Sequence, residues 1–227
     1  MPHFDLLVRQ GTLVTPSGVG QGDVGLREGR IAAIGELDPA QAGATVEALG
    51  LHVLPGVIDT QVHFREPGAE HKEDLEHGLK GAALGGVTAV FEMPNTSPLT
   101  TDAERLADKI ARAGARAVCD FAFYVGATPD NVGQLAALER RPGCCGVKVF
   151  MGSSTGDLLI EDDDTLRAVL ASGSRRVAVH AEDESRLRQR RAIAEESGKV
   201  SAHAEWRDAE TAIRATRRLL DLSRETG

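Results

Sequence analysis

Several features that define whole classes of proteins are scarce in this chain of 227 residues. Aromatic residues make up only 4%, so few side chains could stack on bases, and a net charge of −8 disfavours nucleic acid as a partner. The three cysteines include an adjacent pair and no Cys-x-x-Cys spacing, which gives neither a disulfide framework nor a zinc ribbon. No apolar run approaches the ~20 residues of a membrane span, and no signal peptide opens the chain. These absences predict a cytoplasmic protein that binds neither nucleic acid nor membrane.

What is present is an ordinary globular composition, 41% hydrophobic and 26% charged. Residues 1–54 predict a small β-sandwich-like unit, because short apolar runs such as 6–8 and 12–14 are separated by glycine and suggest hairpins. Residues 38–44 are expected to form a loop. The basic run at 186–191 is interpreted as the solvated face of a helix.

From residue 55 onward, apolar runs alternate with helical patterns. Strands are expected at 57–58, 87–91, 117–125, 147–150 and 176–180, with helices at 72–84 and 101–113 and others starting near 129 and 161. This alternation predicts a parallel sheet with crossover helices, and we expect a β/α barrel of the metal-dependent hydrolase kind. A doubly wound open sheet is the competing fold, but no glycine-rich nucleotide fingerprint follows the first strand.

The length of this second region suits only part of such a barrel. A complete eight-fold barrel needs about 250 residues, whereas residues 55–227 allow about five β/α units and end with a helix expected at 205–224. We therefore expect 55–227 to be the N-terminal portion of a barrel in a larger protein.

Three residues that can carry chemistry lie in or at the ends of expected strands: His63, Lys148 and His180. Histidine at a strand end is a plausible zinc ligand. Lysine rarely enters a core without a role, and burial would lower its pKa and make the amine nucleophilic. Such an amine can take up CO₂ as a carbamate that bridges two metals. An exposed lysine on an edge strand is the alternative.

Two further residues are candidates for binding a carboxylate. Arg65 offers a bidentate guanidinium, and Asn95 follows the second expected strand directly. Either could instead fix its own loop. The glycine-rich residues 152–156 suggest a loop turn rather than an anion cradle, since the Gly-Lys-Ser/Thr ending of a P-loop is missing.

These residues lie in motifs that resemble dihydroorotase of the amidohydrolase superfamily. The match runs in order along the chain, through residues 54–59 (Leu-Pro-Gly-Val-Ile-Asp), 63–68 (His-Phe-Arg-Glu-Pro-Gly), 71–74 (His-Lys-Glu-Asp), 92–96 (Glu-Met-Pro-Asn-Thr), 148–156 (Lys-Val-Phe-Met-Gly-Ser-Ser-Thr-Gly) and 180–184 (His-Ala-Glu-Asp-Glu). The resemblance implies a β/α barrel with a small β unit. It also implies an enzyme of pyrimidine biosynthesis that reversibly hydrolyses the cyclic amide of dihydroorotate to carbamoyl aspartate.

The resemblance also implies roles for individual residues. His63 and His180 would bind one or two Zn²⁺ ions, and Lys148 would be the carbamylated bridging ligand. Arg65 and Asn95 would hold the substrate carboxylate. Zinc would lower the pKa of bound water toward about 7 and polarise the ring carbonyl.

Two departures from the family pattern stand out. Gln61 occupies the first position of the usual His-x-His, on the same side of the strand as His63, and a neutral amide binds zinc poorly. One metal site is therefore expected to be weak, empty or completed by water. The remaining ligand histidine and the aspartate that acts as general base belong to later strands, so we expect the base beyond Gly227.

Other functions stay open. Hydantoinase, dihydropyrimidinase and allantoinase resemble the region around Lys148 but generally lack the Arg-Glu-Pro-Gly turn, so Arg65 and Asn95 favour dihydroorotate. A non-catalytic subunit that scaffolds aspartate transcarbamoylase is the alternative from a different class, motivated by Gln61. A homodimer or a complex with that transcarbamoylase remains open as well.

Overall fold

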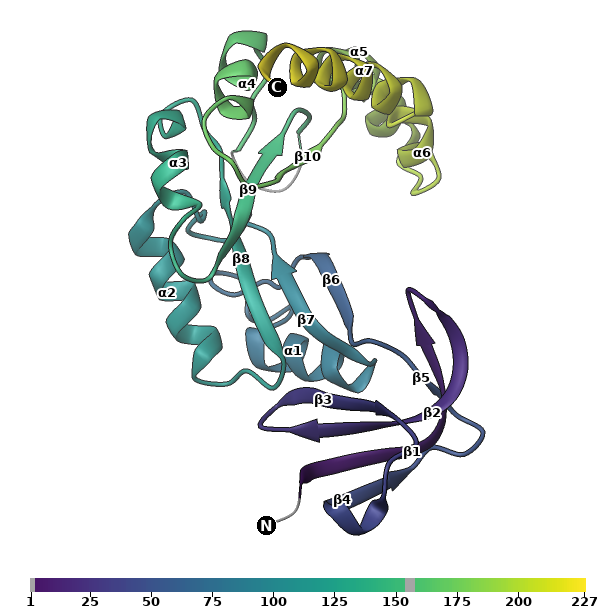
Figure 1. The fold of residues 1–227 in the computed structure, drawn as a ribbon. Helices are drawn as coiled ribbons and strands as arrows, with labels where there is room; N and C mark the ends of the chain where they lie inside the picture. The colour runs from purple at the N-terminus through teal and green to yellow at the C-terminus, as the bar shows by residue number, and fades with distance from the viewer. Residues whose placement is uncertain (1–2, 154–157) are drawn as a thin grey trace. The chain divides into compact units, whose positions relative to one another are not determined.

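The computed structural model describes residues 3–153 and 158–227. The chain divides into two compact units, Met1–Gly56 and Val57–Gly227 (Figure 1). Part of the glycine-rich segment predicted as a loop turn, residues 154–156, lies outside the described residues.

The first unit contains one five-stranded sheet. Its order is β3-β2-β1-β4, and β5 pairs with β1. The predicted strands 6–8 and 12–14 are one long strand with an irregular register between Val8 and Gly11. The unit's strands are β1 (Phe4–Thr15), β2 (Gly18–Arg27), β3 (Arg30–Gly35), β4 (Ala42–Glu47) and β5 (His52–Val53), with a short 3₁₀ helix η1 (Pro39–Gln41) inside the expected loop.

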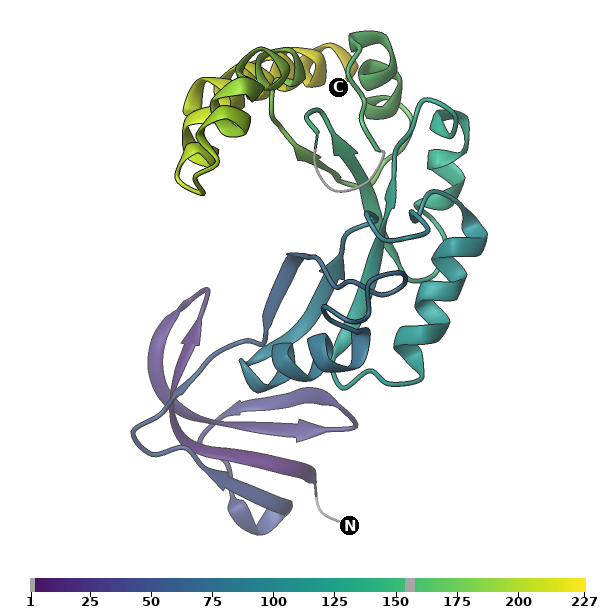
Figure 2. The same cartoon turned by 180° about the vertical axis from the view of Figure 1, so that it is seen from behind.

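The second unit is built on a parallel sheet of five strands in the order β10-β9-β8-β7-β6. The predicted α/β half-barrel is confirmed, because neighbouring strands are consecutive in sequence and the sheet curls (Figures 1 and 2). All five predicted strands are present, as β6 (Val57–Val62), β7 (Val87–Glu92), β8 (Asp120–Gly126), β9 (Cys144–Phe150) and β10 (Val177–His180).

Helices connect these strands, and most begin at an aspartate. The side chains of Asp74, Asp102, Asp162, Asp183 and Asp208 each accept a hydrogen bond from the backbone N–H three residues later, which caps the helix that follows. The helices are α1 (Leu75–Leu84), α2 (Ala103–Gly114), α3 (Leu135–Leu138), α4 (Asp163–Leu170), α5 (Glu184–Ser197), α6 (Ala202–Trp206) and α7 (Ala209–Thr226), and the 3₁₀ helix η2 (Val132–Gln134) precedes α3.

Two helix predictions were wrong in extent. The helix expected near residue 129 is delayed, because Asn131 accepts a hydrogen bond from the N–H of Thr128 and holds a turn there. The final helix, expected as one element, is divided into α6 and α7, since Asp208 caps a new helix through the N–H of Thr211 at 3.0 Å. Both interruptions come from side chains that compete with the helical backbone.

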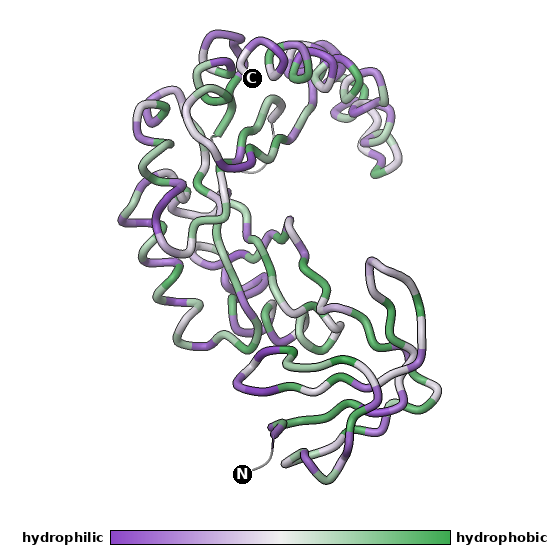
Figure 3. Tube along the Cα trace, in the orientation of Figure 1, coloured by the Kyte–Doolittle hydropathy of each residue, from purple (hydrophilic) through white to green (hydrophobic). Residues whose placement is uncertain are grey.

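The core lies between the sheet and the helices. Leu79 of α1, Val125 of β8 and Val149 of β9 are fully buried within it. In Figure 3 helices α2 and α7 alternate in hydropathy along their length, as elements with one buried face do. Among the described residues, no helix is both long and apolar enough to cross a membrane.

Candidate active site

The candidate residues come together because parallel strands bring their carboxyl ends to one edge of the sheet. His63 follows β6, Asn95 follows β7, and Lys148 and His180 lie near the ends of β9 and β10. The register pairs His180 with Phe150 and Ala178 with Lys148. The half-barrel therefore presents all of them at a single mouth.

His63 is half-buried and is held by one side chain. Its Nδ1 lies 2.8 Å from Oδ1 of Asn95. Burial lowers the pKa of His63, although the hydrogen bond with Asn95 raises it. The positive groups of Arg65, Lys148 and His180 lower the pKa further. With Nδ1–H donating to Asn95, the neutral ring has its lone pair at Nε2, the nitrogen that remains for a metal.

Lys148 is the most deeply buried of the candidates, with only 1% of its surface exposed. Its Nζ lies 5.0 Å from the centroid of the Phe150 ring, and no ion pair reaches it from the residues that the structure describes. Burial lowers the pKa of Lys148 to about 8. A sizeable neutral fraction near pH 8 gives this amine the nucleophilicity that carbamate formation requires.

His180 is oriented by a contact at its Nε2, whereas His63 is oriented by a contact at its Nδ1. Its Nε2 lies 2.5 Å from Oε2 of Glu182, which also pairs with Arg207. Arg207 donates in turn to the backbone oxygen of Ser153 at 2.7 Å. This chain of contacts leaves Nδ1 of His180 for a metal. A pocket of about 890 Å³ opens beside these residues and is also lined by Leu187 and Trp206.

The two candidate carboxylate binders have different surroundings. Asn95 is buried, and its Oδ1 is occupied by His63, so only its Nδ2 donors remain for a substrate. Arg65 is half-buried and lies near His63 and Glu92. The Asn95–His63 contact joins residues 32 positions apart, and no local sequence signal predicts it.

Gln61 is exposed on β6, and its backbone N–H donates to Oδ1 of Asp59 at 3.0 Å. The register of β6 against β7 is irregular between Asp59 and Val62. The strand thus departs from regular pairing at the position where the family pattern has its first histidine.

Sequence reasoning missed a buried ion pair directly beneath this mouth. Glu92 ends β7, and Lys109 reaches it from α2, each with 1% of its side chain exposed. Lys109 Nζ also donates to the backbone oxygen of Met93 at 3.2 Å. Burial raises the pKa of Glu92 to about 7, against the opposing effect of Lys109. The spacing of Lys109 with the buried Leu106 and Ala113 on α2 was the available signal.

The donor set fits part of a zinc site. Zinc in proteins takes four ligands, commonly imidazole and carboxylate groups. His63 and His180 each have one nitrogen committed to a side chain and the other open, and Lys148 has the lowered pKa that carbamate formation needs. Within residues 3–153 and 158–227, no cluster of three His, Cys, Asp or Glu side chains suits a metal. Two histidines and one lysine are therefore the available set among the described residues.

Comparisons with known proteins place these observations in a family context. Residues 50–144 match the family model described as "Dihydro-orotase-like". The chain is 36% identical over 231 residues to an allantoinase of Deinococcus radiodurans, across 99% of this chain and 51% of that protein. An allantoinase of Rubrobacter xylanophilus is 42% identical over 188 residues, across 81% of this chain and 41% of that protein.

Solved structures agree with the fold. The L-hydantoinase (dihydropyrimidinase) from Arthrobacter aurescens superposes with a TM-score of 0.91 at 29% identity, covering 99% of this chain and 51% of that one. The chain spans about half the length of the curated relatives it matches. These matches support the amidohydrolase superfamily, and they do not confirm the narrower expectation of a dihydroorotase.

Proposed function

We propose that this chain is part of a cyclic amidohydrolase of the allantoinase and hydantoinase type. Such an enzyme uses water to break the C–N bond of a ring amide. The carbonyl carbon becomes a carboxylate, the nitrogen gains a hydrogen, and both groups stay on the one ring-opened product. The observation that carries the proposal is the 36% identity to an allantoinase along 99% of this chain. The dihydroorotase expected from the motifs becomes the second candidate, favoured by the match of residues 50–144.

Three residues would hold the metal in this proposal. Nε2 of His63 and Nδ1 of His180 would bind it as imidazole ligands, since Asn95 and Glu182 occupy their other nitrogens. The zinc ion would supply a Lewis acid that lowers the pKa of water and polarises the ring carbonyl.

Lys148 would contribute through a covalent change. Its neutral amine attacks the carbon of CO₂, a C–N bond forms, and the nitrogen loses one proton to solvent. The product is an anionic carbamate with two oxygens. Burial favours this step because it lowers the pKa of Lys148 to about 8.

Arg65 and Asn95 would orient the ring. The guanidinium of Arg65 and the Nδ2 group of Asn95 are donors only, so they suit a carbonyl oxygen of a hydantoin as well as the carboxylate of dihydroorotate. These residues alone do not choose between the two rings.

The test compares three substrates on the complete protein in the presence of zinc. We expect ring opening of allantoin or hydantoin at a catalytic efficiency at least tenfold above that for dihydroorotate, with loss on chelation. The reverse order of efficiencies would return the assignment to dihydroorotase.

Metal content separates an enzyme from a scaffold. Bound zinc together with ring opening supports the enzyme. A folded protein without zinc and without activity on any of the three rings would favour a scaffold subunit, for which aspartate transcarbamoylase is the partner to test by co-purification. A homodimer is to be tested by its mass in solution.

A further inference from the structure

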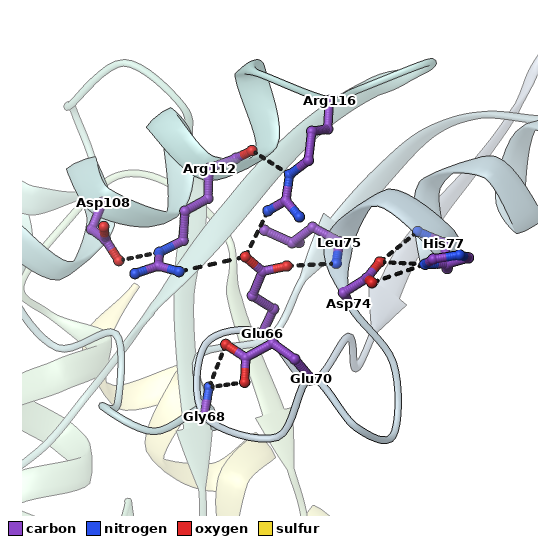
Figure 4. Close-up of polar contacts among 9 residues, drawn as sticks. All are labelled: Glu66, Gly68, Glu70, Asp74, Leu75, His77, Asp108, Arg112 and Arg116. Atoms are coloured by element: carbon purple, nitrogen blue, oxygen red, sulfur yellow. Dashed lines mark hydrogen bonds and ion pairs between the residues drawn. The ribbon is translucent and has the colours of Figure 1, made fainter.

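A buried carboxylate lies behind the turn that carries Arg65. Glu66 is 4% exposed and points between helices α1 and α2 (Figure 4). Its Oε2 accepts the backbone N–H of Leu75 at 3.0 Å, and its Oε1 accepts Arg116 at 2.6 Å and Arg112 at 3.5 Å. Burial would raise the pKa of Glu66, but Arg116, Leu75 and Arg112 hold it below its ordinary value.

Packing fixes the same turn on two other sides. A Cβ added at Gly78 of α1 would lie 2.5 Å from the ring of Phe64, so the ring presses against the helix backbone. The backbone oxygen of Pro67 accepts the N–H of Ser97 at 3.0 Å, and a Cβ at Gly68 would lie 2.3 Å from the oxygen of Ser97. The turn after β6 is thus joined to the loop that follows Asn95.

The charge of Arg65, the preceding residue, lies close enough to His63 and Glu92 to lower the pKa of each. Its backbone is held by two hydrogen bonds, from Arg65 N–H to the oxygen of Glu73 at 3.3 Å and from Ala69 N–H to the oxygen of Arg65 at 2.8 Å. Two adjacent residues of this turn therefore have different surroundings. The side chain of Glu66 is buried beside the helices, and Arg65 lies near His63 of the candidate site.

We propose that Glu66 is a positioning residue that sets the orientation of Arg65 toward the substrate. It acts through the backbone of the turn, because its three donors come from α1, from α2 and from the turn that follows α2, and they tie the turn to these elements. This inference rests on the proposed function in one respect, that Arg65 binds the ring substrate. The contacts of Glu66 do not depend on it. A shift of about 1 Å in a substrate-binding group can reduce rate or binding by about 100-fold.

Glu66→Gln in the complete protein is the first test. Glutamine keeps the size but offers an NH₂ group to arginine donors, so the turn should loosen. We expect hydrogen exchange at the amides of Arg65 and Ala69 to rise about tenfold more than exchange in β8, whose amides report the loss of global stability. KM for ring opening should rise about tenfold, and kcat should change less.

Matched variants sharpen the result. Glu76→Gln removes the exposed partner of Lys80 on α1 and should leave exchange at Arg65 and KM unchanged. Arg116→Gln removes one donor and should give a smaller change in the same direction. If Glu66→Gln does not fold, Arg116→Gln tests the positioning role instead. The measurements are again hydrogen exchange at Arg65 and Ala69 and the KM for ring opening.

The possible outcomes are distinct. Unchanged exchange at Arg65 and Ala69, or changed exchange with unchanged KM, overturns the positioning role. A uniform rise in exchange that includes β8 shows a structural role only and also overturns it. If the parent protein opens none of the three rings, the proposed function fails, and the exchange pattern alone then decides whether Glu66 positions the turn.

Discussion

The two sides of the candidate site are held by different kinds of interaction. On the side of β6 and β7, Glu66 and the Glu92–Lys109 pair are buried charges fixed between strands and helices. On the side of β10, His180 and Glu182 have 31% and 16% of their side chains exposed and rest on contacts with each other and with Arg207. The side of β6 and β7 is thus held by buried charges, and the side of β10 is held by partly exposed ones.

The side of β6 and β7 is therefore expected to contribute mainly to folding stability, and the side of β10 mainly to metal binding. A buried charge that loses its partner destabilises the whole fold, because desolvation is no longer offset. A half-exposed contact can change with little effect on folding, since water replaces the lost partner. Variants of the first side should therefore act mainly on unfolding, and variants of the second mainly on metal binding.

The largest effect is expected from Lys109→Met, which leaves Glu92 buried and unpaired. We expect a loss of about 3–5 kcal/mol in the free energy of unfolding, measured by urea denaturation. Adding Glu92→Leu to the same chain removes the orphaned carboxylate and should recover most of the loss. Equal instability of the single and double variants would contradict the role given to this pair.

A smaller loss, about 2 kcal/mol at pH 7, is expected for Glu66→Gln because its charged hydrogen bonds disappear. The folded protein holds the pKa of Glu66 below its ordinary value of about 4.3. Its stabilisation is thus present above about pH 4.3 and is lost as the pH falls through the lower folded value. Urea denaturation from pH 7 to pH 3 should show the two proteins converging, and a constant difference would refute this account.

On the other side of the site, Glu182→Gln should leave stability nearly unchanged and weaken zinc binding about 10- to 100-fold. The carboxylate that orients His180 is lost, and partners of this kind typically have that effect on affinity. Competition with a chelating dye measures the dissociation constant. An unaltered constant would mean that Glu182 does not orient a metal ligand.

The smallest effect is expected from Arg191→Ala on α5. Arg191 donates to Glu195 at 2.7 Å, and both side chains are exposed. We expect no measurable change in unfolding or in zinc affinity. A clear change in either would show that the side of β10 depends on its outer ion pairs.

The architecture of the second unit could be predicted because its signals are local. Alternating apolar runs and helical patterns marked all five strands, and aspartates marked the starts of helices. The division of the final helix was also visible in sequence, since Asp208 lies three residues before Thr211. The expected single helix at 205–224 did not take this cap into account.

The candidate site was predictable in part for a related reason. His63, Lys148 and His180 follow from strand ends, which local patterns reveal. The contact of Asn95 that orients His63 and the buried Lys109–Glu92 pair join residues distant in sequence and depend on how strands and helices pack. Motifs alone could not distinguish a dihydroorotase from an allantoinase, because Arg65 and Asn95 suit either ring.

The close contact between Gly68 and Ser97 limits how this mouth can be altered. Any side chain at position 68 would meet a backbone oxygen, and its φ of 102° already disfavours other residues. Directed evolution toward new ring substrates would therefore have to keep this glycine while varying positions around it. The two loops that carry Arg65 and Asn95 are then expected to change as one unit, so useful substitutions in one will depend on the residues present in the other.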